Sequence, residues 1–520
     1  MAENKLIRNI SMMSVAILIS RVLGLVRDQL MAFFFGTTFL NDAFVVGYKI
    51  PNLLRNLFGE GALSASFVPI YSEIGIKEDR RKQIDFALQI LGILSVFLLT
   101  LTVIGIIFAP WIVKLLYPGL APHTYKLAVL LTRVMFPYLL WIGLSSTMIA
   151  ILNSHDRFFM TGLSSALLNV GMILSMVVPR FVFGLQGEQL VRWAAWGVFG
   201  GGFLQTVINF PYLKQLGYPF KLFVRFGGEA LNTMWKRFLP SMIGVGVREI
   251  NIVADSLMAS FLAVGSISAL EYGYRLFQFP LGMFAVSTGT VLLPTYSRLV
   301  TMGNWEELSK NLRVAAVNLI YLMLPITTLI IALGGDLVQV VFQRGAFDAK
   351  ASLWTEQALI FYSLGLIFFS FNQTLTPLFF ANKDTRTPVK ISASMVGLNI
   401  VLNFILMQFM QHRGLAFATS ITAMVNFSIQ FYLLRKKMPH ISFAGILPNF
   451  LKTLGICVLM LVLLLVANHF YHPRGFWPQL IKLGLLGTAS LLFFYGLGLL
   501  LKLDFLAEAR DRLWNKFRRK

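Results

Sequence analysis

The chain has 520 residues, of which 57% are hydrophobic and only 13% are charged. A water-soluble protein of this size cannot bury so much apolar surface, because about half of any folded surface stays in contact with solvent. The net charge of +22 comes from short basic loops between apolar runs, a pattern that argues against nucleic acid as a partner and for membrane lipids. The single cysteine, Cys457, excludes a disulfide framework and a thiolate metal site.

Hydrophobic runs, each about the length of a membrane span, recur along the whole chain, and we count fourteen of them. Each can cross a hydrocarbon core of about 30 Å as a helix. The first run begins near Arg8 and carries Arg21, Arg27 and Asp28 where a signal peptide would have a small-residue cleavage site, so we expect it to stay in the membrane. We therefore predict an all-α, polytopic membrane protein with fourteen transmembrane helices.

Basic residues concentrate in alternate loops. The basic segments are the amino terminus, residues 77–82, 214–237, 383–390 and 435–437, and the tail 502–520. By the positive-inside rule these segments and both termini face the cytoplasm, which fits an even number of spans. Leu513, Trp514 and Phe517 lie among basic residues in the tail, which predicts an amphipathic helix on the anionic leaflet.

An ordered series of similar segments indicates an internal duplication. The pairs are Asp28–Phe34 with Asp255–Phe261, Gly47–Lys49 with Gly273–Arg275, Val68–Ser72 with Leu293–Ser297, and Leu168–Val170 with Leu398–Ile400. Corresponding loops keep their sidedness, so the repeats are parallel, as in transporters whose substrate site lies between two halves. The predicted parts are two lobes of six helices at 1–220 and 221–440, two added helices within 441–503 (roughly 447–470 and 477–501), and a tail at 504–520.

The first two spans carry many charges. These are Arg21, Arg27, Asp28, Lys49 and Arg55, with Asp42 and Glu60 near the span ends, and the second repeat adds Arg248 and Arg275. An arginine at the centre of a span costs about 2.5 to 3.5 kcal/mol on insertion scales, so we expect these side chains to face a water-filled cavity. Cations outnumber acids there, and guanidinium groups match phosphate oxygens, which favours a pyrophosphate head group as the transported anion.

Ion pairs that hold helices together are an alternative for Arg27 beside Asp28 and for Arg248 beside Glu249. Arg21, Arg55 and Arg275 have no adjacent acid. Glycines and prolines also interrupt these spans, at Pro51, Pro240, Pro280 and Gly282 among others. Such breaks predict bending at a gate, with close helix packing through small residues as the alternative.

A second polar cluster consists of Asp255, Asn399, Asn403 and Thr419. Oxygen ligands of this kind suit a hard monovalent cation, so sodium is a possible cofactor, whereas hydrogen bonds between helices explain the asparagines and the threonine equally well. The chain has no Walker-type loop, and its six histidines have no metal-binding spacing. We therefore expect a transporter and not an enzyme, driven by an ion gradient or by the membrane potential, which is worth about 2.3 kcal/mol per charge per 100 mV.

Several motifs together resemble a known family. They are Ser20–Asp28, Asn41–Phe44, Lys49–Arg55, Gly59–Pro69, Ala259–Ala263, Tyr274–Gly282 and Leu293–Pro294. These segments look like the MurJ (MviN) family of lipid II flippases in the multidrug/oligosaccharidyl-lipid/polysaccharide (MOP) exporter superfamily. The resemblance extends over the length of the chain and includes the number of spans.

The resemblance implies that the protein moves lipid II, which is undecaprenyl-pyrophosphate-linked MurNAc-pentapeptide-GlcNAc, to the outer leaflet of the bacterial inner membrane by alternating access, for peptidoglycan synthesis and cell shape. It implies a cationic cavity and, in the last two helices, a groove for the polyprenyl tail. The residues expected to bind substrate are Arg21, Arg27, Arg55, Arg275, Asp42 and Lys49. Cell-wall synthesis and division proteins are possible partners.

Two details depart from the family pattern. Asn403 stands where the sodium-binding pattern, which matches Asp255, Asn399 and Thr419 elsewhere, has an aspartate. Arg275 lacks the acidic neighbour found in some members, because Tyr274 and Gln278 flank it. Three other functions compete with lipid II transport: a multidrug antiporter, a flippase for another polyprenyl-pyrophosphate-linked oligosaccharide of the O-antigen type, and a membrane transferase. The basic cavity and the two added spans argue against the first, and the absence of a convincing catalytic acid argues against the last.

Overall fold

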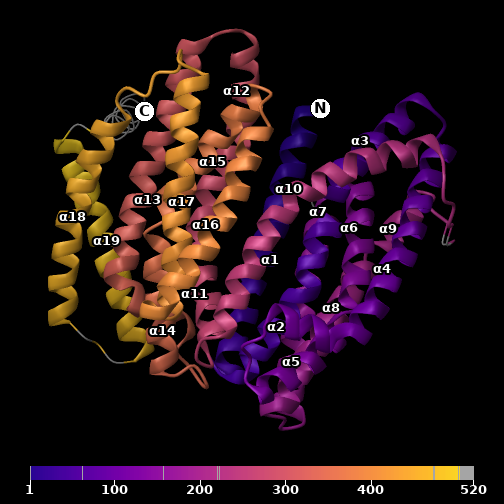
Figure 1. The fold of residues 1–520 in the computed structure, drawn as a ribbon, viewed down its shortest axis with the longest axis horizontal. Helices are drawn as coiled ribbons and strands as arrows, with labels where there is room; N and C mark the ends of the chain where they lie inside the picture. Colours follow the sequence, from indigo (N-terminus) through magenta and orange to yellow (C-terminus); the bar gives the residue numbers. More distant parts are fainter. Residues whose placement is uncertain are drawn as a thin grey trace. The chain divides into compact units, whose positions relative to one another are not determined.

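A computed structural model gives the fold of the chain (Figure 1). It describes residues 2–60, 62–155, 157–219, 221, 223–471, 473, 475–501 and 503. Within these ranges every regular element is a helix. The amphipathic tail predicted at 504–520 lies outside the described residues, as do the side chains of Glu60 and Arg248.

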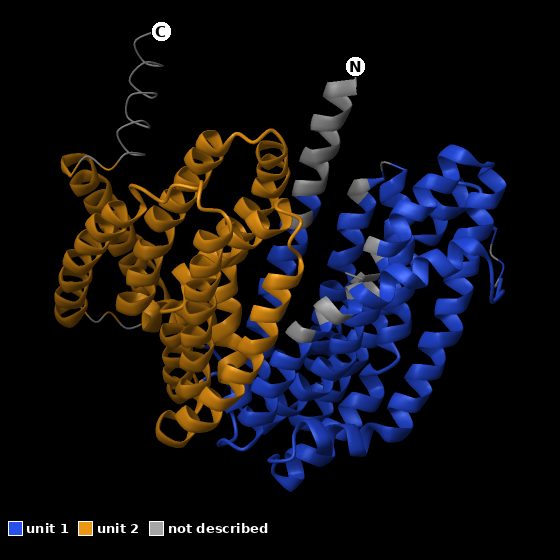
Figure 2. Cartoon of the chain, turned by 45° about the horizontal axis from the view of Figure 1, so that its top comes forward, with its two compact units in different colours: residues 1–268, 344–347 blue, residues 269–343, 348–520 orange. Residues whose placement is uncertain are grey.

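The chain forms two compact units, residues 1–268 with 344–347 and residues 269–343 with 348–520 (Figure 2). Unit 1 contains α1 (Ala2–Phe35), α2 (Phe39–Arg55), η1 (Asn56–Glu60), α3 (Ala62–Lys77), α4 (Arg80–Leu116), α5 (Pro122–Met135), α6 (Tyr138–Ser154), α7 (Phe158–Val182), α8 (Gly187–Val207), α9 (Phe210–Gln215) and α10 (Glu229–Ser260). Most of α11 (Ser266–Pro280) lies in unit 2, followed by η2 (Leu281–Val286), α12 (Ser287–Thr301), α13 (Trp305–Phe342), α14 (Ala349–Ser363), α15 (Leu366–Ala381), α16 (Arg386–Met410), α17 (His412–Lys437), α18 (Ile446–Phe470) and α19 (Phe476–Leu500).

The compact units and the sequence repeats divide the chain at different places. The repeat predicts a boundary at residue 220, whereas the units divide after Ser268. The difference arises because α10, the first helix of the second repeat, packs on α3 and α4 of unit 1. The boundary between the sequence repeats therefore reflects the duplication, whereas the boundary between the compact units reflects helix packing.

The described helices include many that are suited to a membrane. In the described part of the chain, nine helices are long and apolar enough to span a membrane, or ten if the pair Ala349–Ser363 and Leu366–Ala381, bent by 42°, forms a single span. The two helices predicted near 447–470 and 477–501 are α18 and α19. The protein is therefore an all-helical, multi-pass membrane protein.

The two repeats share a break in their second span. In unit 1, α2 passes into the π-helix η1 at Asn56, and in unit 2, α11 passes into the π-helix η2 at Leu281. The offset between Gly47 and Gly273 is 226 residues (273 − 47), which maps Asn56 onto Gly282, inside η2. A π-helical turn interrupts the normal hydrogen-bond ladder and bends a helix. A π-helical turn therefore lies where the sequence predicts bending, near Pro280 and Gly282, and it occurs in both repeats. Bending at a gate stays a prediction.

Small residues allow α7 and α8 to approach closely. A Cβ atom on Gly201 would lie 2.9 Å from the Cα of Leu168, and one on Gly171 would lie 2.6 Å from the Cα of Gly201. Close approach through glycine is how helices gain van der Waals contact in lipid, where apolar side chains alone give little preference for protein over lipid. Within the run of three glycines at 200–202, Gly201 therefore serves helix packing.

We predict that Gly201→Ala lowers the free energy of unfolding by about 1 to 3 kcal/mol, because the new methyl group overpacks the α7 backbone. Gly200→Ala is the matched control, since a Cβ there meets no atom within 4 Å. Thermal unfolding of the purified proteins in detergent measures the difference. Equal melting temperatures for the two variants would contradict the packing described for α7 and α8.

A polar contact closes the turn between α15 and α16 outside the apolar core of the helices. Asp384 accepts hydrogen bonds from the Thr387 amide (3.0 Å), from the Thr387 hydroxyl (2.7 Å) and from Lys437 near the end of α17. Burial raises the pKa of Asp384, but the hydrogen bonds from Lys437 and Thr387 outweigh it and lower this pKa to about 2. The ionised carboxylate therefore stabilises the fold.

A lowered pKa in the folded state gives stability above the unfolded value of 3.8 that is lost as the pH falls toward the folded value. We therefore expect part of the drop in melting temperature between pH 4 and pH 2, a range set by these two pKa values, to come from protonation of Asp384. In Asp384→Asn this drop should be smaller, with a lower melting temperature at neutral pH. Parallel melting curves for the variant and the parent protein across this pH range would contradict the assignment.

Candidate functional site

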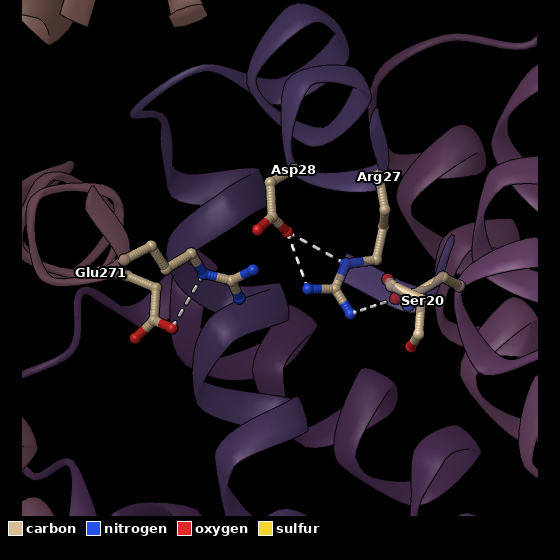
Figure 3. A network of polar contacts seen from close by, with 6 residues as sticks. Ser20, Arg27, Asp28 and Glu271 are labelled. Carbon is tan, nitrogen blue, oxygen red and sulfur yellow. Dashed lines mark hydrogen bonds and ion pairs between the residues drawn. The ribbon is translucent and has the colours of Figure 1, made fainter. Parts of the chain in front are cut away.

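Arg27 and Asp28 form an ion pair on α1 (Figure 3). Arg27 donates from Nε and Nη2 to Oδ1 of Asp28 at 3.0 and 2.9 Å, and from Nη1 to Oδ1 of Asn169 at 2.9 Å. Asn169, on α7, also donates to the Ser20 carbonyl at 3.1 Å. The ion pair left open by the sequence is thus present, and it fixes the Arg27 guanidinium at the packed α1 and α7 surfaces. Both side chains keep 15% of their surface exposed.

Arg21 differs from Arg27, although both lie on α1. Its side chain is exposed, and it lies six residues earlier, about 9 Å along the helix axis. An exposed guanidinium can change its contacts at little cost. Arg21 therefore offers a cation that a ligand can reach directly.

Arg55 ends α2 and begins a hydrogen-bonded chain to α10. Its Nη2 donates to Oδ1 of Asn56 at 3.1 Å, and Nδ2 of Asn56 donates to Oε1 of Glu249 at 3.1 Å. Glu249 is 4% exposed. Sequence reasoning considered Glu249 only as a neighbour of Arg248, whereas the fold connects it to the start of η1. Lys49, also on α2, is partly buried.

Arg275 has an acidic partner one helical turn earlier. Its Nε donates to Oε1 of Glu271 at 3.2 Å, with 30% and 20% of the two side chains exposed (Figure 3). Tyr274 and Gln278, which flank Arg275 in the sequence, are not acidic. Residues four apart share one face of a helix, so the pair of Glu271 with Arg275 could have been found from helical periodicity.

Asp42 binds the beginning of another helix. Its carboxylate is 3% exposed and accepts hydrogen bonds from the Gly265 amide (2.6 Å), the Ser268 amide (2.9 Å) and the Ser268 hydroxyl (2.5 Å). Ser268 belongs to the first turn of α11 and Gly265 directly precedes this helix, so the carboxylate lies at the helix amino terminus, where a negative charge also interacts favourably with the helix dipole. The carboxylate for which the resemblance implied substrate binding is therefore already supplied with three donors.

The residues expected to bind sodium do not share one unit. Asp255 lies on α10 of unit 1 and accepts from Nδ2 of Asn251 at 3.4 Å. Asn399 and Asn403 lie on α16 of unit 2, are fully buried, and are joined by a hydrogen bond of 2.9 Å. Thr419, on α17, donates to the Leu415 carbonyl at 3.0 Å. In the described part of the chain no group of three or more His, Cys, Asp or Glu side chains is placed to hold a metal ion, and sodium binding stays a prediction.

We predict that Asp42→Asn destabilises the protein by about 1 to 3 kcal/mol, because the amide group turns a donor toward backbone amides that need an acceptor. Ser268→Ala is the matched control. It removes one donor and leaves the two backbone hydrogen bonds to the carboxylate, so its effect should be smaller. Melting temperatures in detergent compare the variants, and a larger loss for Ser268→Ala would contradict the capping role of Asp42.

The family model described as "Lipid II flippase MurJ" matches residues 31–485. A probable lipid II flippase MurJ of Buchnera aphidicola subsp. Schizaphis graminum is 33% identical over 521 residues, covering 97% of this chain and 99% of the relative. A probable lipid II flippase MurJ of Vibrio cholerae is also 33% identical, over 436 residues and 82% of each chain.

Solved structures agree with the sequence relatives. A structure of lipid II flippase MurJ in an inward closed conformation has a TM-score of 0.77 at 28% identity and covers 93% of this chain and 97% of its own. An inward-facing MATE family transporter of the MOP superfamily has a TM-score of 0.68 at 14% identity, covers 82% and 96%, and shares the fold. The family model and the relatives cover most of the chain, and the chain therefore belongs to the MurJ family of lipid II flippases.

Proposed function

We propose that this protein moves lipid II from the cytoplasmic to the outer leaflet of the bacterial inner membrane, with both termini in the cytoplasm. The observation that carries the proposal is the match to lipid II flippases over nearly the whole chain, including relatives that cover 97% and 82% of it. A lipid-linked diphosphate also fits the charges of the spans, because cations outnumber acids in them. The relatives are flippases and transporters, which supports transport without covalent chemistry.

The proposal includes fourteen membrane spans. In this count, four pairs of consecutive helices each form one span: α2 and α3, α5 and α6, α11 and α12, and α14 and α15. With these pairs counted once, and with α9 left out because its six residues are too short to cross a bilayer, the described helices form fourteen segments. This count agrees with the hydrophobic runs in the sequence, and an even number keeps both termini on one side.

We propose that arginines of the spans bind the pyrophosphate. Arg27 and Arg275 are each oriented by an acid, and both remain partly exposed. A guanidinium that is already oriented loses less freedom when it binds phosphate oxygens in bidentate fashion. Arg21 is exposed and supplies a mobile contact. The membrane potential, negative inside, favours outward movement of the anionic head group by about 2.3 kcal/mol per charge per 100 mV.

Sodium coupling is a separate part of the proposal and concerns Asp255, Asn399, Asn403 and Thr419. Asn403 in place of an aspartate reduces the negative charge of such a site, so we expect weak sodium binding. Flipping measured in sodium and in potassium at equal ionic strength tests it. Identical rates and identical melting temperatures in the two salts would remove sodium from the mechanism.

We predict that Arg21→Ala stops lipid II flipping in proteoliposomes and leaves the melting temperature unchanged, because an exposed cation that serves the ligand contributes little to folding. Arg192→Ala is the matched control. It removes one exposed cation that is paired with Glu188 on α8, so flipping should persist. Full activity in Arg21→Ala, or an equal loss in Arg192→Ala, would contradict the role of Arg21 in binding the head group.

A further inference from the structure

The last two helices contact the rest of unit 2 through α13 (Figure 1). Elsewhere they are largely exposed, and Leu451, Val458 and Leu485 each have more than half of their surface accessible. In lipid, apolar contacts of this kind do not fix one helix on another, because lipid tails are as apolar as leucine. Polar contacts must therefore decide how α18 and α19 are attached.

Polar contacts occur at both ends and in the middle of this interface. Near the start of α18, the Tyr321 hydroxyl donates to Oδ1 of Asn449 at 2.6 Å. In the middle, Cys457 on α18 lies close to the side chain of Thr328 on α13, whose hydroxyl donates to the Leu324 carbonyl at 2.9 Å. Near the end of α18, Nδ2 of Asn468 donates to the Ala332 carbonyl at 3.2 Å.

The end of the interface near the end of α18 and the start of α19 contains a buried ion pair. Lys482 on α19 is 2% exposed. Its ammonium lies 2.9 Å from Oδ2 of Asp336 and 3.1 Å from Oδ1, and it also donates to Asn468. One turn along α13, Oε1 of Gln339 accepts from Nε2 of Gln479 at 2.6 Å. Asn468 thus joins α18, α19 and α13 at one point.

These contacts form a single stripe on α13. Its members are Tyr321, Thr328, Ala332, Asp336 and Gln339. Successive members are seven, four, four and three residues apart, so they share one helical face. The stripe extends for about 27 Å along the axis, close to the roughly 30 Å of a hydrocarbon core. The two added helices are therefore attached across the full thickness of the membrane.

From this stripe we infer that α13, α18 and α19 move as one rigid block throughout transport, with Lys482 and Asp336 fixing the register of α19. The inference rests on the proposed function and deepens it. Sliding α19 along α13 would separate a buried ammonium from its carboxylate in a medium of low dielectric constant, which is strongly unfavourable. The apolar surface of α18 and α19 accordingly keeps its shape, and a polyprenyl tail slides along it without any opening of these helices.

The native cysteine allows a direct test. Cys457 is the only cysteine of the chain, so Thr328→Cys gives a protein with one pair of thiols, which joins α13 to α18 when oxidised. The full chain is reconstituted in proteoliposomes with fluorescent lipid II and treated with molecular iodine, which enters the bilayer. The control is Thr328→Cys combined with Cys457→Ala, treated identically.

We expect the two thiols to cross-link and the flipping rate of the oxidised protein to equal that of the reduced protein. Flipping that falls to background on oxidation and returns with dithiothreitol, while the control is unaffected, would overturn the rigid block. Absence of a cross-link in protein that flips lipid II would equally overturn it, because the rigid block requires residues 328 and 457 to stay in side-chain contact, within reach of a disulfide. If the reduced protein does not flip lipid II at all, the proposed function fails first, and the two failures are thereby distinguished.

A second experiment separates the effect of Lys482 on the register of α19 from its effect on protein stability. Lys482→Met should lower both melting temperature and flipping, because Asp336 is left buried without its cation. Adding Asp336→Leu removes the second charge and should restore the melting temperature, whereas flipping should stay low because the register is no longer fixed. Recovery of both quantities would show that the ion pair contributes stability alone, and it would contradict the positioning role of Lys482.

Discussion

A charged or polar side chain inside a bilayer must find its hydrogen-bond partners in the protein, because lipid offers none. This constraint explains the main polar contacts of the structure. Arg27 is held by Asp28 and Asn169, Asp42 binds the first turn of α11, and Lys482 is paired with Asp336. Most of these contacts join helices that are distant in sequence. The need to solvate each charge therefore also determines where the helices lie.

Charges in the spans serve two purposes that burial separates. Asp42 and Lys482 are almost completely buried, and their contacts hold helices together. Arg27 and Arg275 are paired but keep 15% and 30% of their side-chain surface exposed, so they can still meet an anion. The acid paired with each of these arginines restricts the conformations of the arginine side chain before any ligand binds. An arginine that is already oriented in this way loses little further freedom when it binds an anion.

Much of the fold could be predicted from the sequence, because hydrophobic length and repetition are local signals. The helices near 447–470 and 477–501 were predicted almost to the residue, and the adjacent Arg27 and Asp28 were recognised as a potential pair. The contact of Asp42 with Ser268 crosses 226 residues, and nothing local indicates it. The sequence also does not predict that α10 packs on α3 and α4. The duplication predicts that the first helices of the two repeats have corresponding neighbours. Lys482 and Asp336 were overlooked, although a single charge in each of two apolar runs was the available signal.

We propose that these partnered and exposed cations serve the outward movement of lipid II. The most direct test of this proposal is the distribution of lipid II between the leaflets after depletion of the protein, followed with a label that cannot cross the membrane. The account predicts that lipid II accumulates in the inner leaflet, inaccessible to the label, and that the outer pool disappears. An outer pool that is undiminished while the protein is absent would contradict it.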